Sequence, residues 1–229
     1  MKVLVACEES QTVCKAFRKR GHEAYSCDIQ ECSGGHPEWH IKWDALALIN
    51  GNCSFLTCDG ELHRVDGKWD MLIAHPPCTY MSKAGACRMY PKAGEIDRER
   101  LIKARKAKAF FMEFYNANCD RIAIENPTPL RVVQLPKESQ VIQPWQFGEP
   151  YSKRTLLWLK GLPNLKETKV MKNFSPWMPS NTGGFSRGKG GARGKAHDPI
   201  TASKTFPGIA KAMAEQWGGL LMKEVIERG

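Results

Sequence analysis

The pattern of apolar and polar positions along the chain predicts a set of short buried strands. Apolar runs too short for helices occupy residues 2–6, 23–30, 70–74, 120–127 and 155–159. Runs of this length, bounded by polar or turn-forming residues, are typical of strands in the interior of a sheet. The pattern therefore predicts one central sheet.

Helical periodicity fills the intervals between these runs. Residues 12–22 predict a first helix, 96–118 give the clearest helix of the chain, and 206–227 predict an amphipathic helix with a break at its paired glycines. Residues 43–50 predict a short helix. Two Asp-Gly turn signals within 53–69 predict a small β-excursion.

The order of these elements points to the fold class. A strand, a helix and a second strand ending in the acidic Asp28 open the chain, as in doubly wound nucleotide-binding folds. We expect an α/β fold of the Rossmann-like type. The catalytic domain is expected to comprise 1–160 and 206–229, with 161–205, rich in Gly, Pro, Lys and Arg, as a small separate region.

Composition narrows the class of partner. The chain has 229 residues, of which 42% are hydrophobic, and it carries a net charge of +10 with a pI near 9.2. Such a charge favours a polyanionic partner, nucleic acid first, although a basic protein without one remains an alternative. With no apolar run long enough for a bilayer and no secretory signal, we expect a cytoplasmic protein whose nine cysteines stay reduced.

Two strand ends carry candidate chemistry. The strand at 70–74 runs into "HPPC", in which two prolines stiffen the backbone directly before Cys78. The strand at 120–127 ends in Glu125 and Asn126, followed by a proline. Ligands of open α/β folds bind at the carboxyl ends of strands. A thiol and a carboxylate at neighbouring strand ends suit nucleophilic and acid–base catalysis.

This ordered combination resembles the cytosine-5 DNA methyltransferase family, whose catalytic motifs are a Pro-Pro-Cys followed by a Glu-Asn. The segment "TVCKAFRKRGHEAYSCDI" looks like the first helix and second strand of compact phage and prophage members. The segment "GIAKAMAEQWG" is similar to the C-terminal helix that completes the family's cofactor site. The resemblance covers most of 1–160 and 200–220. It implies a Rossmann-like methyltransferase fold with a very small, Gly/Arg-rich target-recognition region.

The resemblance also implies roles for single residues. Cys78 would add to carbon 6 of a cytosine, making carbon 5 reactive toward the methyl group of S-adenosylmethionine. Glu125 would protonate or hydrogen-bond ring nitrogen 3, and Asn126 would position it. Either Lys153 or Arg154 could occupy the place of the family's arginine near the base, and Arg154 is preferred. The loop after Cys78 would close over the base.

The implied cofactor site takes in the first loop and the ends of the first strands. Asp28 would accept hydrogen bonds from the ribose hydroxyls and Asp44 would lie near the adenine. The first loop departs from the family, because "ACEESQTV" has no glycine where a left-handed backbone is expected. One of its two glutamates could bind the ammonium group of the cofactor. The full expected set is Cys7, Glu8, Glu9, Ser10, Asp28, Ile29, Asp44 and Pro76.

The expected DNA contacts come from the loop after Cys78 and from the basic, glycine-rich stretch within 161–205. Cations among glycines suit phosphate contacts better than base reading, so we expect low sequence specificity or a short site. The residues are Ser82, Lys83, Arg187, Lys189, Arg193 and Lys195.

Several alternatives stay open. The enzyme could act on a pyrimidine nucleotide, or add a different carbon unit to DNA cytosine. A non-catalytic DNA-binding protein on the same fold is a third reading. The spacing of Cys27, Cys32, His36 and His40 could also form a zinc site, although Cys27 is expected in the core, and no metal is predicted.

Overall fold

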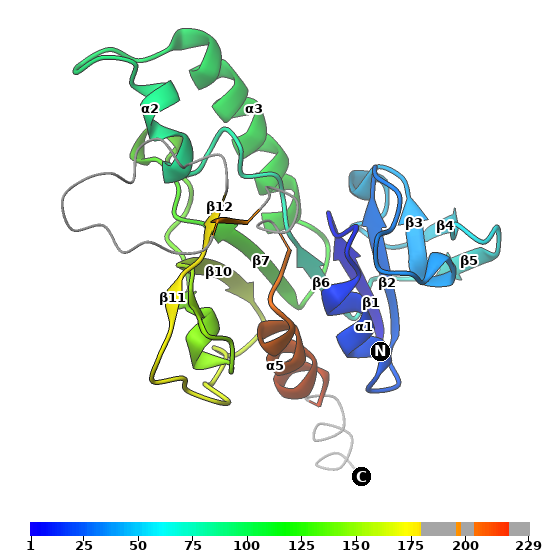
Figure 1. The fold of residues 1–229 in the computed structure, drawn as a ribbon. Coiled ribbons are helices and arrows are strands. Elements are labelled where there is room, and N and C mark those ends of the chain that lie inside the picture. Colours follow the sequence, from blue (N-terminus) through cyan, green and yellow to red (C-terminus); the bar gives the residue numbers. More distant parts are fainter. Residues whose placement is uncertain (180–195, 198–203, 220–229) are drawn as a thin grey trace.

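A computed structural model describes residues 1–179, 196–197 and 204–219 (Figure 1). The main sheet has seven strands in the order β3-β2-β1-β6-β7-β10-β8. Their bounds are Lys2–Ala6 (β1), Glu23–Asp28 (β2), His40–Lys42 (β3), Met71–Ala74 (β6), Ile122–Pro127 (β7), Gln140–Ile142 (β8) and Thr155–Lys160 (β10). The prediction of one central sheet is confirmed.

The strand order has a reversal between β1 and β6. From β1 the chain moves outward to β2 and β3, then returns to place β6 on the other side of β1, all as parallel neighbours. Strand β7 follows in parallel, and β10 runs antiparallel to both β7 and β8. In open α/β sheets the crevice at such a reversal, beyond the carboxyl ends of the strands, is where ligands bind.

Helices cover both faces of this sheet (Figure 1). Helix α1 (Thr12–Arg18) and helix α5 (Pro207–Gly218) pack together on one face, where alternate strand residues such as Val5 contribute to the core. Helix α3 (Arg98–Tyr115) covers the other face, where strand residues such as Leu4 contribute to the core. Burial of adjacent strand residues on opposite faces explains the continuous apolar runs.

Smaller elements surround the sheet. Strands β4 (Cys53–Leu56) and β5 (Leu62–Val65) form the predicted β-excursion, with the first Asp-Gly at its turn. The short helix α2 (Ala86–Met89) precedes α3. The remaining short strands are Tyr151–Ser152 (β9), Ser175–Pro176 (β11), Met178–Pro179 (β12) and Ala196–His197 (β13).

The structure differs from two local predictions. The expected helix at 43–50 is only a single 3₁₀ turn at Ala45–Ala47, which Asp44 caps at its start, because Gly51 and Asn52 take a left-handed backbone soon after it. Helix α5 ends at Gly218 with Gly219 as its C-terminal cap, and residues 220–227 of the predicted segment lie outside the described residues. Within the described chain no helix is long and apolar enough to cross a membrane.

Candidate active site

The structure brings the two predicted strand ends together. Strands β6 and β7 pair in parallel with Ala74 opposite Ile124, so Cys78 and Glu125 leave the sheet at the same edge. The side-chain amide of Asn126, only 1% exposed, donates a 2.8 Å hydrogen bond to the carbonyl oxygen of Pro76. The second strand end therefore holds the proline segment that leads to the cysteine.

The two loops that follow are also joined to each other. The Leu130 amide donates to the Met81 carbonyl oxygen at 2.7 Å, and the Lys83 amide donates to that of Thr128 at 2.9 Å. Ser82 is buried between these contacts. The start of the loop after Cys78 is thus fixed in place, so any closure over a base falls to the part beyond it.

Helix α3 holds the same loop from its other side. The guanidinium of Arg100 donates a 2.8 Å hydrogen bond to the carbonyl oxygen of Thr79 and lies 5.2 Å from the ring centre of Tyr80. A β-carbon on Gly85 would come within 2.5 Å of that guanidinium, so the glycine allows the close approach.

A histidine that the sequence reasoning did not assign lies against the glutamate. Nδ1 of His75 is 3.2 Å from Oε2 of Glu125, and the two side chains are only 10% and 12% exposed. Burial alone would raise the pKa of Glu125. The hydrogen bond from His75 and the charge of Lys153 outweigh that effect, so the pKa lies below its ordinary value. The only sequence signal for His75 was its place directly before the two prolines.

The thiol of Cys78 is partly buried, and its pKa is raised. Burial is the largest cause and the charge of Glu125 adds to it, whereas Lys153 and a hydrogen bond with Ser82 act in the opposite direction. In the free protein the thiol is therefore largely protonated at neutral pH, and cations near it favour the reactive thiolate.

Of the two adjacent cations before β10, Lys153 rather than Arg154 lies near this pair. Lys153 influences both Cys78 and Glu125 electrostatically and lies 5.8 Å from the ring centre of Phe206. The side chain of Arg154 is 54% exposed and lies 3.9 Å from Glu138. The two residues precede β10 in succession, and the structure places the one that sequence reasoning ranked second beside the site.

The first loop adopts the left-handed backbone that its sequence seemed to disfavour. Cys7 has φ = 59° and Gln11 has φ = 56°, although neither is a glycine. The fully buried side chain of Gln11 donates from Nε2 to the His36 carbonyl oxygen at 2.8 Å, and its Oε1 accepts from the His36 backbone amide at 3.0 Å. These contacts stabilise a strained conformation of a kind that often occurs at functional sites.

Glu8, a proposed ligand for the cofactor ammonium, instead caps helix α1. Its carboxylate oxygens accept hydrogen bonds from the amides of Val13 at 2.6 Å and Cys14 at 3.1 Å. The side chain is only 4% exposed, and burial raises its pKa although these amides and the charge of His75 oppose the rise. Glu9 accepts a hydrogen bond from the Ser33 hydroxyl, and its carboxylate lies 3.8 Å from Nζ of Lys204.

Four of the expected cofactor residues lie at or just after the ends of β1, β2 and β3: Cys7, Asp28, Ile29 and Asp44. Burial raises the pKa of the Cys7 thiol, and the carboxylates of Asp28 and Asp44 raise it further, so the three side chains share one region. Ile29 is 75% exposed and Trp43 64% exposed, and Trp43 donates its amide to the Asp28 carbonyl oxygen. The carboxylates can accept hydrogen bonds from the hydroxyls of a sugar, and the exposed apolar side chains beside them can contact the ring of a base.

The cysteines and histidines of the alternative zinc site are not assembled as metal ligands in the described part of the chain. Cys27 is fully buried, and both ring nitrogens of His40 are in hydrogen-bond contact, with Ser26 and with the Gln30 carbonyl oxygen. In the described ranges no three His, Cys, Asp or Glu side chains are grouped as metal ligands. Four predicted DNA contacts lie outside the described residues: Arg187, Lys189, Arg193 and Lys195.

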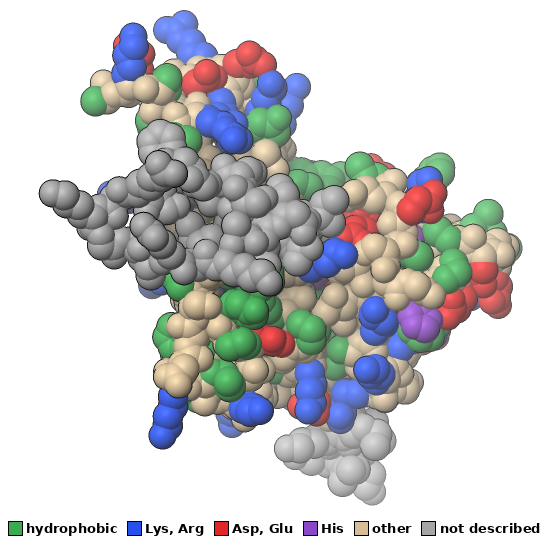
Figure 2. Space-filling view, viewed as in Figure 1, with side chains coloured by type: hydrophobic (Ala, Val, Ile, Leu, Met, Phe, Trp, Pro, Cys, Tyr) green, Lys and Arg blue, Asp and Glu red, His purple; other side chains and the backbone are tan. Residues whose placement is uncertain are grey.

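Of the two remaining DNA-contact predictions, Lys83 is exposed and Ser82 is buried. Lys83 precedes α2, and Figure 2 shows Lys and Arg side chains gathered with a few acidic ones at the end of the molecule where α2 and the start of α3 lie. This leaves a basic surface next to the loop that carries Cys78.

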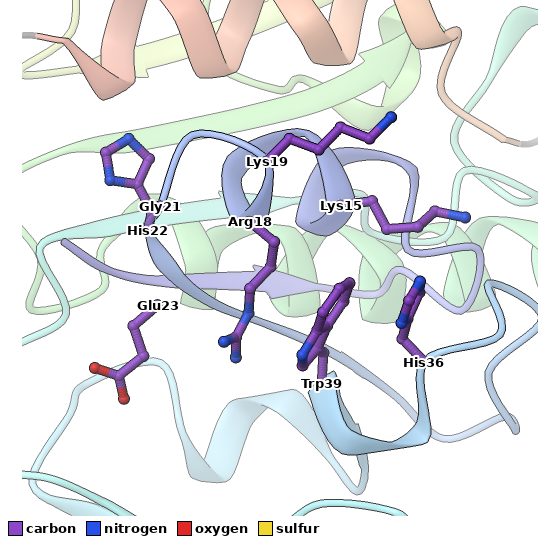
Figure 3. A pocket seen from close by; sticks show the side chains of 8 residues that line it. All are labelled: Lys15, Arg18, Lys19, Gly21, His22, Glu23, His36 and Trp39. Atoms are coloured by element: carbon purple, nitrogen blue, oxygen red, sulfur yellow. The ribbon is translucent and has the colours of Figure 1, made fainter.

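A separate pocket of about 640 Å³ lies beside α1 (Figure 3). His36 and Trp39 stack at 3.8 Å on one side of it, and Arg18 lies over Trp39 at 5.2 Å. Two of its cations are hydrogen-bonded to the backbone: Lys15 donates to the Gly34 carbonyl oxygen and Arg18 to that of Ala24. The pocket shares no residue with the cysteine–glutamate pair.

No family model matches the chain, and no curated protein matches it. Among solved structures it is similar to a protein described as a DNA modification methyltransferase encoded within a prophage (E. coli), with 12% identity, a TM-score of 0.42, and coverage of 75% of this chain and 52% of that one. It is also similar to a mutant of Spodoptera frugiperda DNMT2, with 14% identity, a TM-score of 0.36, and coverage of 79% and 58%. The chain spans little more than half the length of each. Likenesses this weak assign no function, which has to come from the residues of the chain itself.

Proposed function

We propose that this chain is a DNA cytosine-5 methyltransferase that uses Cys78 as its nucleophile and S-adenosylmethionine as its methyl donor. The observation that carries the proposal is that Cys78 and Glu125 lie at the ends of two neighbouring strands. The hydrogen bond from Asn126 to Pro76 joins these two strand ends. The pair lies next to the strand-order reversal, where open α/β folds bind ligands. Its residues are those of the family that the sequence resembles.

The chemistry follows from the two side chains. The Cys78 thiolate forms a bond to carbon 6 of the cytosine while Glu125 gives a proton to ring nitrogen 3, and carbon 5 becomes electron-rich. The cofactor, when bound, supplies an electrophilic methyl group. A base then takes the proton from carbon 5, the bond from sulfur to carbon 6 breaks to release the thiolate, and ring nitrogen 3 returns its proton to Glu125, which restores the ring. A covalent adduct of this kind divides one difficult substitution into easier steps.

The cofactor site fits a nucleoside without a phosphate. Asp28 and Asp44 would receive the sugar and base end, next to the exposed side chains of Ile29 and Trp43. In doubly wound folds the first helix N-terminus ordinarily binds a pyrophosphate. Here the carboxylate of Glu8 occupies that place, which disfavours a dinucleotide. S-adenosylmethionine carries a sulfonium and no phosphate, so this obstacle does not apply to it.

The DNA partner is supported by charge and by the need to reach the thiol. The net charge of +10 and the exposed Lys83 beside the Cys78 loop favour a polyanion. Cys78 is partly buried, so a base in duplex DNA has to leave its stack to meet it. Low specificity remains part of the proposal, because the basic stretch within 161–205 suits phosphate contacts.

The test is a covalent trap. The protein is incubated with labelled S-adenosylmethionine and DNA containing 5-fluorocytosine, from which carbon 5 cannot lose a proton, and the complex is separated under denaturing conditions. We expect a stable adduct that Cys78→Ala abolishes. Cys58→Ala and Cys87→Ala, at exposed cysteines, are matched controls that keep it.

Other outcomes decide against the proposal. An adduct formed with free 5-fluoro-dCMP but not with DNA would make the enzyme one of nucleotides. DNA binding without cofactor binding or adduct would make the chain a non-catalytic DNA-binding protein. An adduct that survives Cys78→Ala would assign the nucleophile to another thiol.

A further inference from the structure

The backbone fixes His75 at the edge between β1 and β6. Its amide donates a 3.0 Å hydrogen bond to the carbonyl oxygen of Ala6, which extends the pairing of the two strands by one residue. The ring then reaches Glu125 with Nδ1 3.2 Å from Oε2, at 10% side-chain exposure. A contact held by strand pairing on one side and burial on the other is well ordered.

The ring also influences a second buried carboxylate. The charge of His75 lowers the pKa of Glu8 against the effect of burial, which places the two side chains near one another. The hydroxyl of Thr205 approaches Nδ1 at 3.5 Å, and Nε2 is buried without a hydrogen-bond partner among the described residues. Among the described residues, the carboxylates of Glu8 and Glu125 and the cation of Lys153 are therefore the charged groups of this cluster around the imidazole.

These surroundings favour the ionised form of Glu125. Because its pKa lies below the ordinary value, the carboxyl group is ionised at neutral pH before a base arrives. An ionised carboxylate can accept a hydrogen bond, but it cannot give a proton to ring nitrogen 3. Water has little access to a group that is 12% exposed, so the nearest donor is the imidazole.

We propose that His75 is the proton partner of Glu125, so that the imidazole and the carboxylate hold one proton between them and deliver it to the bound base. The inference rests on the proposed function. As the bond from sulfur to carbon 6 forms, the single proton that the pair shares passes from Nδ1 of His75 through the carboxylate of Glu125 to ring nitrogen 3. When the bond from sulfur to carbon 6 breaks, ring nitrogen 3 returns that proton to the pair by the same route. His75 acts through Glu125 and is a positioning residue.

Three substitutions distinguish two roles of His75: orienting the carboxylate of Glu125, and supplying its proton. The amide of Asn in His75→Asn can take the place of Nδ1 and donate to Glu125, but it does not titrate. His75→Gln places its amide nearer the position of Nε2, and His75→Ala removes both functions. The rate of adduct formation on 5-fluorocytosine DNA is measured in a single turnover across pH, with thermal unfolding and DNA binding as controls for folding.

We expect His75→Asn to be slower than the wild type at neutral pH by roughly 10²-fold, a usual range for loss of acid–base catalysis. Its rate relative to the wild type should recover toward acid pH, where Glu125 binds a proton directly, so that its pH profile is displaced downward from that of the wild type. His75→Ala and His75→Gln should be slower than His75→Asn at every pH, because they also lose the contact that orients the carboxylate.

Two results would overturn the inference. A pH profile of His75→Asn that coincides with that of the wild type would show that no proton passes through the ring. Equal slowing of all three variants with an unchanged pH optimum would reduce His75 to packing. Absence of any adduct in the wild type itself is a different outcome, since it refutes the proposed function before His75 is reached.

Discussion

The side chain of Asn126 donates a 2.8 Å hydrogen bond to the carbonyl oxygen of Pro76, which joins the end of β7 to the turn before the cysteine. Both groups are sequestered from water, and Asn126 is 1% exposed. When a buried carbonyl oxygen loses its hydrogen-bond donor, nothing compensates the free energy that was needed to remove it from water. This bond therefore contributes both to stability and to the placement of Cys78.

Replacement of Asn126 by alanine should affect folding and chemistry together. We expect Asn126→Ala to lower the free energy of unfolding by about 1–3 kcal/mol, because the Pro76 oxygen is left without a donor. The rate of adduct formation should fall as well. Urea unfolding measures the first effect. Asn116→Ala, at the exposed end of α3, is the control, and equal stability of the two variants would contradict the role of the bond.

Lys153 should set the reactivity of the thiol. Its charge opposes the burial that raises the pKa of Cys78, so Lys153→Met should raise that pKa further. Because only the thiolate reacts, the pH midpoint of alkylation should then move upward. Iodoacetamide labelling of the Cys78 peptide, followed by mass spectrometry, measures it. Arg154→Met, which removes the neighbouring exposed cation, should leave the midpoint in place.

Glu8 should make stability depend on pH in an unusual direction. Its pKa is raised in the folded protein, so the folded state binds more protons than the unfolded state in the window above the ordinary value of 4.5. The contribution of Glu8 to the free energy of unfolding is fully present below that value, and it is lost as pH rises through the pKa that Glu8 has in the folded protein. The difference in unfolding free energy between wild type and Glu8→Gln should therefore shift against the wild type as pH rises. A pH-independent difference would contradict this.

The exposed ring of Trp43 should contribute to cofactor affinity. Contact between aromatic rings contributes about 0.5–1.5 kcal/mol beyond area burial. We expect Trp43→Ala to weaken S-adenosylmethionine binding by about two- to tenfold, as measured by calorimetry. Leu62→Ala, at an apolar residue exposed on the β4–β5 hairpin, is a matched control and should bind as the wild type does. Equal affinities of the two variants would place the cofactor elsewhere.

The basic stretch within 161–205 should govern the salt dependence of DNA binding. Each phosphate contact contributes about 0.9 to the slope of log affinity against log salt. Replacement of Arg187, Lys189, Arg193 and Lys195 by alanine should therefore reduce that slope by about 3 to 4. Filter binding at several salt concentrations measures it. An unchanged slope would remove this stretch from the DNA interface.

The parts of the fold that could be predicted are those that local patterns determine. Strand β6 and its proline exit follow from an apolar run and two residues that cannot extend a ladder. Helix α3 follows from periodicity over many residues, with Asp97 as its N-terminal cap. Segment 43–50 has the same kind of pattern over too short a length, so Asp44 caps the start of a single 3₁₀ turn that does not continue into a helix.

The parts of the site that could not be predicted depend on register and backbone geometry. The contact between His75 and Glu125 requires the pairing of β6 with β7, which no local pattern specifies. Lys153 and Arg154 are adjacent cations, and only the placement of the segment before β10 decides which of them faces the thiol. The capping role of Glu8 depends on the left-handed turn at Cys7, which sequence alone disfavours.

The backbone bonds from Leu130 to Met81 and from Lys83 to Thr128 have a consequence for kinetics. Folding, rather than substrate, sets the distance between the nucleophile and its acid, so little ordering is left for the encounter with DNA. The barrier that remains belongs to the nucleic acid, in the unstacking of one cytosine. Single-stranded and mismatched cytosines should then react faster than paired ones.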